Sequence, residues 1–277
     1  MVMDRMIRNL TELALSEDIG SGDVTTEATV PADSIATAVM LAKQDLILAG
    51  LGVSREVFHY LDPTIEVTFF VRDGDRISTG TEIAQLFGNT RALLMGERVA
   101  LNLLQHMSGI ATQTARYVEK IKGLKAEVLD TRKTYPGLRK LEKYAVRMGG
   151  GKNHRFGLYD GILIKDNHIK AAGSITKAIE GVRKKAYLLL KIEVETKTLD
   201  EVREALAARA DVIMLDNMQV DMMRNAVTLI DHQALIEASG NVTLETIRGI
   251  AETGVDFISC GSLTHSASAA DISMKIK

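Results

Sequence analysis

From residue 126 onward, short apolar segments alternate with helical patterns, and this alternation is the strongest constraint on the fold. The apolar, β-prone segments are Ala126–Leu129, Gly161–Ile164, Leu188–Val194, Val212–Leu215, Ala234–Glu237 and Phe257–Ser259. The helical patterns between them are Leu138–Met148, Ser174–Lys184, Leu199–Ala208, Gln219–Ile230 and Leu244–Thr253. Strands that alternate with helices are typical of a parallel sheet. The sequence therefore predicts an α/β domain, built as an open doubly wound sheet or as a barrel.

Polar residues at the ends of the predicted strands favour the barrel. In α/β barrels, functional groups come from the C-terminal ends of many strands rather than from one switch point. Here Asp130, Lys165 and Asp216 begin polar segments directly after three different strands. A G-x-G-x-x-G motif does not follow the first strand, so a dinucleotide-binding domain is not indicated.

The first third of the chain predicts a separate domain of mixed helices and strands. Helical patterns are expected at Met3–Leu15 and Gly52–Leu61, and strands at Ile35–Ala42, Ile65–Val71 and Glu82–Phe87. A long helical stretch, Thr90–Lys122, is expected to be interrupted near Ser108-Gly109 because small residues weaken a helix. The predicted domains are residues 1–110 and 111–269, with a last strand at about 270–277 that returns to the first domain.

Composition excludes several classes of protein. The 277 residues include 34 Lys and Arg against 36 Asp and Glu, a net charge of -2 that argues against a dedicated nucleic-acid-binding protein. Neither a membrane-spanning apolar segment nor a signal peptide is recognisable. The single cysteine, Cys260, cannot form an internal disulfide, so a cytoplasmic location is expected.

The near-neutral total hides a basic segment. Residues 132–170 contain ten basic and three acidic side chains, a net charge of +7, which leaves -9 for the rest of the chain. The basic side chains nearest to predicted strand ends are Arg132, Lys133, His154, Arg155 and Lys165. Arginine offers a planar fork that matches carboxylate or phosphate, and lysine offers a point charge. Together they predict a pocket for small polyanionic molecules.

Acidic residues and Ser-Gly turns follow the later strands. Glu195 and Asp216 would repel a phosphate in the same pocket unless a cation lay between them, and Mg²⁺ binds through one or two carboxylates plus substrate phosphates. Ser239-Gly240 and Gly261-Ser262 follow the last two strands, where barrels commonly bind phosphate. His265 lies close enough in sequence to donate to that phosphate.

Several motifs, in order along the chain, resemble those of the quinolinate phosphoribosyltransferase family. The core motifs are Thr131–Thr134, Pro136–Arg139, Gly149–Gly151, Asn153–Arg155 and Leu163–His168. Further similar motifs are Gly22–Thr26, Glu97–Asn102, Ser108–Thr112, Glu193–Thr196 and Leu263–Ser266. The similarity runs from about Asp18 to the C-terminus.

This resemblance implies an N-terminal open-faced α/β sandwich followed by an incomplete α/β barrel. It also implies the transfer of a phosphoribosyl group from 5-phosphoribosyl-1-pyrophosphate to quinolinate. The products would be nicotinate mononucleotide, pyrophosphate and CO₂, in a step of NAD biosynthesis. Both substrates are polyanions, in agreement with the basic pocket.

The resemblance also implies roles for individual residues. The quinolinate carboxylates would be held by Arg132, His154, Arg155 and Lys165. Lys133 would lie near the pyrophosphate and the reacting ribose carbon, and Glu195 and Asp216 would bind Mg²⁺ and ribose hydroxyls. The 5-phosphate would be held by Ser239, Gly240, Gly261 and His265. Arg98 would reach across a dimer interface into the neighbour's site, which implies a homodimer or a hexamer.

The chain departs from the family pattern at Asn241, where a second glycine is common. Asparagine tolerates positive φ better than most residues, so the loop geometry is expected to survive. Three other functions remain open at this point: a related phosphoribosyltransferase with another acceptor, a barrel lyase that forms a Schiff base at Lys133 or Lys165, and a regulatory protein that binds nicotinate-like ligands.

Overall fold

The computed structural model describes residues 5–187 and 189–277, which form two compact units. The N-terminal unit contains the chain up to Gln113 together with residues 136–150 and 267–277. The barrel unit contains residues 114–135 and 151–266. These units differ from the predicted ranges 1–110 and 111–269 chiefly at residues 136–150, because that segment carries helix α5 (Arg139–Met148) and groups with the N-terminal unit.

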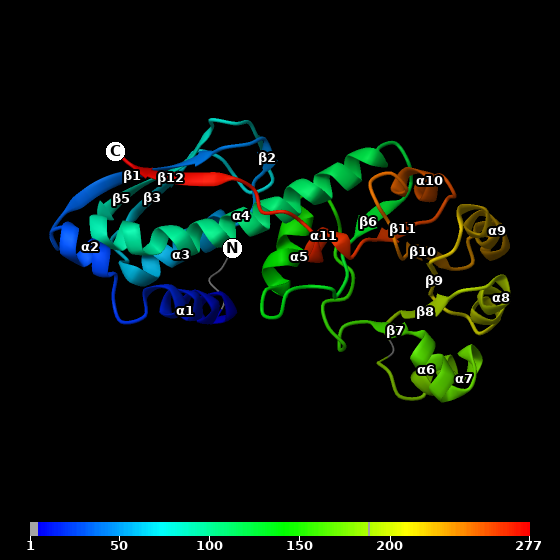
Figure 1. Cartoon of the computed structure of the whole chain (residues 1–277). Helices are drawn as coiled ribbons and strands as arrows, with labels where there is room; N and C mark the ends of the chain where they lie inside the picture. The colour runs from blue at the N-terminus through cyan, green and yellow to red at the C-terminus, as the bar shows by residue number, and fades with distance from the viewer. Residues whose placement is uncertain (1–4, 188) are drawn as a thin grey trace. The chain divides into compact units, whose positions relative to one another are not determined.

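The N-terminal unit is built on a four-stranded antiparallel sheet. Its strands are β1 (Ile35–Ala42), β3 (Glu66–Phe69), β5 (Glu82–Asn89) and β12 (Ile272–Ile276), in the order β12-β1-β5-β3. Strand β12 pairs with β1 from Ala38 opposite Ile276 to Ala42 opposite Ile272, so the end of the chain completes this sheet (Figure 1). A small second sheet pairs β2 (Leu46–Ile47) with β4 (Arg76–Ile77).

Two helices in this unit differ from the sequence prediction. Helix α1 (Arg5–Ile19) continues beyond Leu15, and helix α2 (Val24–Thr29) is not among the predicted helices. Gly20, with φ 55°, separates the two helices. Asp23 then caps α2, because its Oδ1 accepts a hydrogen bond from the Thr26 amide at 2.9 Å. Residues 17–26, which are rich in Gly and Asp, therefore contain both the end of α1 and the start of α2.

The unit also contains α3 (Leu51–Leu61) and the part of α4 (Thr90–Lys120) up to Gln113. The expected interruption of α4 near Ser108-Gly109 is wrong, because the helix is continuous through both residues. Ser108 is fully buried, and its hydroxyl accepts from the Ala49 amide at 3.1 Å. A Cβ at Gly109 would overlap the carbonyl oxygen of Ser268. The small residues permit close packing of α4 instead of breaking it.

Substituting Gly109 with alanine is expected to destabilise the protein, although alanine favours helix. The added Cβ would overlap Ser268 and lie 3.1 Å from the Ala269 Cα, so the backbone must shift at a cost of about 1 to 3 kcal/mol. Gly181→Ala in helix α7 (Ile175–Arg183) is the control, because a Cβ there meets no atom within 4 Å. Urea unfolding midpoints measure both variants. Equal stability of the two would contradict the packing argument.

The barrel unit contains six parallel strands in the order β6-β11-β10-β9-β8-β7. They are β6 (Glu127–Leu129), β7 (Ile162–Ile164), β8 (Ile192–Thr196), β9 (Val212–Asp216), β10 (Leu235–Ser239) and β11 (Phe257–Ser259). The first strand thus lies beside the last. Within the described residues, no pairing joins β6 to β7. This is the strand order of a barrel that stays open on one side, as the resemblance implied.

Helices follow these strands on the outside of the sheet, as Figure 1 shows for α8 (Leu199–Ala207) and α9 (Val220–Ile230). Helix α10 (Ile247–Ala251) is shorter than expected, and α6 (Asp166–Ala172) and α11 (Ser262–His265) were not predicted. The predicted strand Leu188–Val194 begins only at Ile192. Leu188 lies outside the described residues, and Leu189 is exposed.

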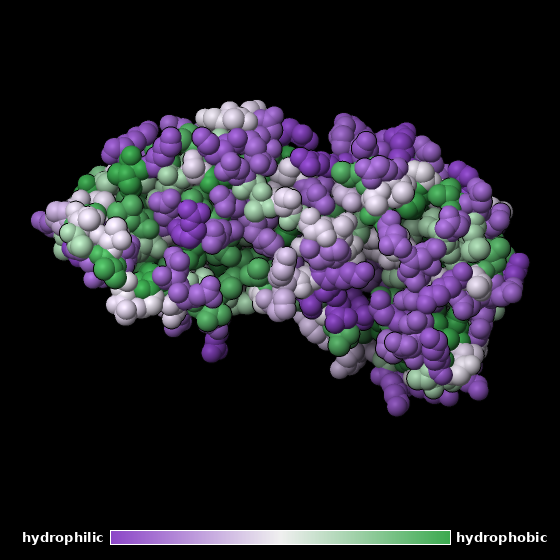
Figure 2. Space-filling model, in the orientation of Figure 1, coloured by the Kyte–Doolittle hydropathy of each residue, from purple (hydrophilic) through white to green (hydrophobic). Residues whose placement is uncertain are grey.

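The surface is mixed in character. Figure 2 shows hydrophilic side chains spread over the visible face, with smaller hydrophobic areas between them. Among the helices of the described residues, none combines the length and apolarity needed to span a bilayer.

Candidate active site

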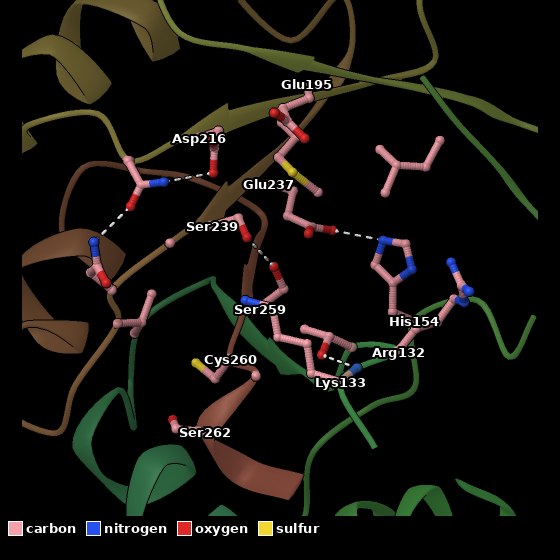
Figure 3. Close-up of a pocket in the computed structure, with 18 of the residues that line it drawn as sticks. Arg132, Lys133, His154, Glu195, Asp216, Glu237, Ser239, Ser259, Cys260 and Ser262 are labelled. Atoms are coloured by element: carbon pink, nitrogen blue, oxygen red, sulfur yellow. Dashed lines mark hydrogen bonds and ion pairs between the residues drawn. The ribbon is translucent and has the colours of Figure 1, made fainter. Parts of the chain in front are cut away.

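A cavity of about 700 Å³ lies at the C-terminal ends of the barrel strands. Every residue that lines it belongs to the barrel unit. The predicted site residues among its lining are Arg132, Lys133, His154, Arg155, Lys165, Glu195, Asp216, Ser239, Gly240, Gly261 and His265. Figure 3 shows several of these side chains directed toward a common space. The structure therefore brings together the predicted site residues, with Arg98 as the exception.

Strand periodicity explains why polar side chains meet inside this unit. Successive residues of a strand point to opposite faces, so residues two apart share a face. Glu195, Asp216 and Ser239 are the last or next-to-last residues of β8, β9 and β10. Ser239 lies opposite Asp216 on one side and Ser259 on the other. The parallel register thus places Asp216, Ser239 and Ser259 at one level of the cavity mouth, and Glu195, which pairs with Met214, lies two residues deeper.

Part of the basic segment lines this cavity. Its cavity-lining members are Arg132, Lys133, Arg155 and Lys165. Arg139, Lys140, Lys143 and Arg147 lie on α5 in the N-terminal unit instead. The cavity is nevertheless cationic on this side. Burial, and then the charge of Arg132, lowers the pKa of Arg155 from its usual value.

Lys133 is positioned by contacts with the residues that follow β11, the last strand of the barrel unit. Its backbone carbonyl accepts a hydrogen bond from the Thr264 hydroxyl at 2.7 Å, and its amide donates to the Thr131 hydroxyl at 3.0 Å. A Cβ at Gly261 would lie only 2.8 Å from the Lys133 Cδ. Glycine at position 261 therefore leaves the space that the lysine side chain occupies.

Glu195 and Asp216 form an acidic pair at the ends of β8 and β9. Glu195 is 8% exposed, and its carboxylate lies 3.8 Å from the Lys165 Nζ and 3.7 Å from the Lys197 Nζ. Burial, and then the charge of Asp216, raises the pKa of Glu195. Two neighbouring carboxylates are a suitable oxygen-ligand set for a hard cation such as Mg²⁺.

The loops after β10 and β11 contain the residues predicted to hold a phosphate. Gly240 has φ 95° and Asn241 has φ 50°, so asparagine does adopt the left-handed conformation expected of it. The Ser259 hydroxyl donates to the Ser239 hydroxyl at 3.0 Å. The ring of His265 lies 3.3 Å from the place a Cβ at Gly261 would occupy.

Below the cavity mouth, His154 contacts two buried glutamates, and we call these three residues the His154 cluster. The His154 Nε2 lies 2.9 Å from Glu193 and 3.4 Å from Glu237, which are 7% and 2% exposed. The Arg155 amide donates to Nδ1 at 2.7 Å. One oxygen of each glutamate has no hydrogen-bond partner within the described residues. The three groups also lie close enough together to hold a metal ion.

The His154 cluster holds a proton more tightly than its members would in water. Burial alone lowers the pKa of His154, but hydrogen bonds to Glu193 and Glu237 and their charges outweigh it and raise the pKa to about 10. Burial raises the pKa of Glu193 to about 7, the hydrogen bond from His154 opposes this, and the charge of Glu237 adds to it. Because Nδ1 accepts from Arg155, the shared proton lies between Nε2 and the carboxylates.

Stability is therefore expected to fall as the pH rises from 7 toward 10. In this range the folded His154 cluster keeps a proton that the unfolded chain, with a histidine pKa near 6.5, has released. The folded state then binds more protons than the unfolded state, so the unfolding free energy decreases with pH, by at most about 1.4 kcal/mol per unit for one proton. Thermal unfolding from pH 6 to 10 measures this slope. A Glu237→Gln variant with an equally steep slope would contradict the assignment.

Arg98 is the predicted site residue that the cavity does not include. It lies exposed on α4 in the N-terminal unit. Two other contributors had no assigned role in the sequence prediction. They are Glu237, which ends the predicted strand Ala234–Glu237, and Asn217, which directly follows Asp216. The signal for both was their position at the C-terminal end of a strand, but sequence alone did not show what they contact.

The fold and this cavity define an enzyme of the α/β-barrel type that binds small anions. Comparison with known proteins identifies the family. Residues 23–108 match the family described as quinolinate phosphoribosyl transferase, N-terminal domain, and residues 110–275 match its C-terminal domain. The chain belongs to the quinolinate phosphoribosyltransferase family and is a pentosyltransferase.

Individual relatives agree over nearly the whole chain. The probable carboxylating nicotinate-nucleotide pyrophosphorylase of Bacillus subtilis is 49% identical over 94% of this chain and 90% of its own length. The decarboxylating mitochondrial quinolinate phosphoribosyltransferase 2 of Nicotiana glauca is 46% identical over 98% of this chain and 82% of its own. The crystal structure of NadC from Streptococcus pyogenes superposes with a TM-score of 0.96 at 44% identity, covering 100% of this chain and 98% of that one.

Proposed function

We propose that the cavity in the barrel unit is the active site in which this chain transfers the phosphoribosyl group of 5-phosphoribosyl-1-pyrophosphate to quinolinate. Quinolinate loses its 2-carboxylate in the same reaction, and the products are nicotinate mononucleotide, pyrophosphate and CO₂. This is the reaction of the family, in NAD biosynthesis. The observation that supports the site is the meeting, in one cavity of about 700 Å³, of cationic residues from β6 and β7 with acidic residues from β8 and β9.

The cationic side of the cavity would bind the acceptor. Arg132, Arg155 and Lys165 are its candidates for the two carboxylates of quinolinate, because guanidinium groups match carboxylates in pairs and lysine supplies a point charge. His154 was predicted to join them, but both of its ring nitrogens already contact protein groups. We therefore propose that His154 helps to position Arg155, because its Nδ1 accepts a hydrogen bond from the Arg155 amide. It also contributes to the charge of the cavity wall.

Transfer would proceed by electrostatic stabilisation rather than through a covalent enzyme intermediate. As pyrophosphate leaves, negative charge accumulates on its oxygens, where Lys133 can offset it. Positive charge develops at the ribose carbon and is favoured by the Glu195 and Asp216 carboxylates. Fixed charges placed where charge develops are usually the largest catalytic contribution. After the pyridine nitrogen has attacked, the pyridinium ring accepts the electron pair released with CO₂.

Mg²⁺ is part of this proposal. Glu195 and Asp216 would hold it, and the raised pKa of Glu195, to which the charge of Asp216 contributes, supports a cation between them. When bound, Mg²⁺ would neutralise charge on the phosphate oxygens of the donor substrate. The 5-phosphate would be held by Ser239, Gly240, Gly261 and His265, which lie at or after the ends of β10 and β11.

A homodimer or a hexamer is also proposed, with Arg98 completing the site of the neighbouring subunit. The exposure of Arg98 on α4 supports this arrangement. A cytoplasmic location is proposed as well. It is supported by the single, buried Cys260, whose pKa is raised to about 12 by burial and then by the charge of Glu237, so that the thiol is unreactive.

The direct test incubates the purified protein with quinolinate, 5-phosphoribosyl-1-pyrophosphate and Mg²⁺. We expect CO₂ and nicotinate mononucleotide in equal amounts. Nicotinate in place of quinolinate is the control acceptor, and its use as the better substrate would overturn the decarboxylating assignment. Borohydride treatment during turnover tests the Schiff-base alternative, since a covalent adduct at Lys133 or Lys165 would overturn the electrostatic mechanism.

A further inference from the structure

A chain of hydrogen bonds joins the two loops that follow β9 and β10. Asn217 donates from Nδ2 to the Oδ1 of Asp216 at 2.9 Å. Asn241 donates from its own Nδ2 to the Oδ1 of Asn217, also at 2.9 Å. All three residues line the cavity, and Figure 3 draws the bond at Asp216 as a dashed line. The phosphate loop is thereby connected to a carboxylate of the acidic pair.

Two residues of this chain of hydrogen bonds, Asn217 and Asn241, have a left-handed backbone conformation. Asn217 has φ 55° and Asn241 has φ 50°, a left-handed conformation that residues other than glycine adopt infrequently. The Asn217 amide donates to the Ser239 carbonyl at 2.8 Å, which ties the two loops together at the backbone as well. Strained residues persist only where the surrounding contacts hold them.

Gly240 is required by the same arrangement. A Cβ at this position would overlap the carboxamide of Asn217, and the φ of 95° is itself unsuited to a side chain. The missing side chain of Gly240 thus provides the place where the Asn217 carboxamide lies. Asn217 is therefore held between the two loops by its contacts with Asp216, Ser239 and Asn241.

Asp216 keeps one oxygen for another partner. Among the described residues, its side chain accepts a hydrogen bond only at Oδ1, from Asn217. A carboxylate fixed at one oxygen presents the other in a defined direction, which is how supporting residues commonly orient metal ligands. Loss of the Asn217 contact would leave the carboxylate free to rotate.

We propose that Asn217 is a positioning residue that connects the phosphate loop at Asn241 to the cation-binding carboxylate of Asp216. A phosphate bound beside Asn241 restricts the loop, the restriction passes through the Asn217 carboxamide, and Asp216 becomes better oriented for the cation. The phosphate and the cation then bind cooperatively, and by linkage each strengthens the other equally. This inference rests on the proposed function of the cavity.

The test measures binding rather than turnover. Mn²⁺ serves as a spectroscopic probe for the cation, and ribose 5-phosphate as a probe for the phosphate loop. Electron paramagnetic resonance gives the Kd of Mn²⁺ with and without ribose 5-phosphate. For the unmodified protein we expect at least a 5-fold tightening by ribose 5-phosphate, the lower end of usual coupling factors.

Two variants break this chain of hydrogen bonds without adding backbone strain. Asn217→Gly and Asn241→Gly both replace a left-handed residue with glycine, which adopts that conformation freely. In each we expect the coupling to fall to about 1-fold, and kcat/KM for 5-phosphoribosyl-1-pyrophosphate to fall more than that for quinolinate. His232→Gly is the matched control, because His232 has φ 59° and does not line this cavity.

The outcomes separate this inference from the proposed function. Coupling that persists in both glycine variants, or that is absent from the unmodified protein, would overturn the role of Asn217 even if the enzyme forms nicotinate mononucleotide. Failure of the unmodified protein to form that product would overturn the proposed function whatever the binding result. Loss of coupling in the His232→Gly control as well would also count against the inference, because the effect would then not be local.

Discussion

Replacing Lys133 with alanine is expected to lower kcat by about 10²- to 10³-fold, the usual loss on removing one fixed group that stabilises the transition state. The side chain is exposed toward the cavity, so its removal leaves no buried hole and the fold should persist. The measurement is the rate of CO₂ release at saturating quinolinate and 5-phosphoribosyl-1-pyrophosphate. An unchanged melting temperature is the control, and near-normal kcat would remove Lys133 from the mechanism.

Gly261→Ala tests the same lysine without removing it. The new Cβ would lie 2.8 Å from the Lys133 Cδ, so the side chain must move away from its place. A displacement of about 1 Å at a reacting centre can reduce the rate by about 10²-fold. Gly249→Ala on α10 is the control, because a Cβ there has no neighbour within 4 Å. Equal rates for these two variants would contradict the argument that Gly261 places Lys133.

The architecture of the barrel unit could be predicted because it depends on local patterns. The segments Val212–Leu215 and Phe257–Ser259 correspond closely to β9 and β11, since short apolar runs between polar turns leave little choice of structure. The prediction that site residues follow the strands rests on the same pattern. Strand direction alone brings Glu195 and Asp216 to one end of a parallel sheet.

The features that could not be predicted depend on contacts between distant segments. Nothing in the sequence around Gly109 shows that Ser268 will lie against it, so a packing glycine resembled a helix break. The basic residues of α5 resembled pocket residues, because the chain gives no sign that α5 groups with the N-terminal unit. Likewise, the contact of His154 with Glu237 forms only when the segment between α5 and β7 packs against β10.

Glu195→Gln is expected to have the second large effect, again about 10²- to 10³-fold in kcat. Glutamine keeps the shape of the side chain and removes its charge, so the variant separates electrostatics from packing. The carboxylate would favour the positive charge that develops at the ribose carbon, and with Asp216 it would bind Mg²⁺. The variant should therefore also need a higher Mg²⁺ concentration for half-maximal rate, measured by titration of Mg²⁺ at fixed substrate concentrations.

A second expectation for this variant concerns the lysines that contact Glu195. Lys165 and Lys197 lie 3.8 and 3.7 Å from its carboxylate, and the loss of that charge leaves the cavity more cationic. Quinolinate, a dianion, should then bind at least as well as before, so KM for quinolinate should not rise while kcat falls. Glu252→Gln, which removes an exposed charge on the helix side of the barrel unit, controls for the change in net charge. If Glu195→Gln kept both its kcat and its Mg²⁺ requirement, Glu195 would be a structural partner of the two lysines and not part of the catalytic machinery.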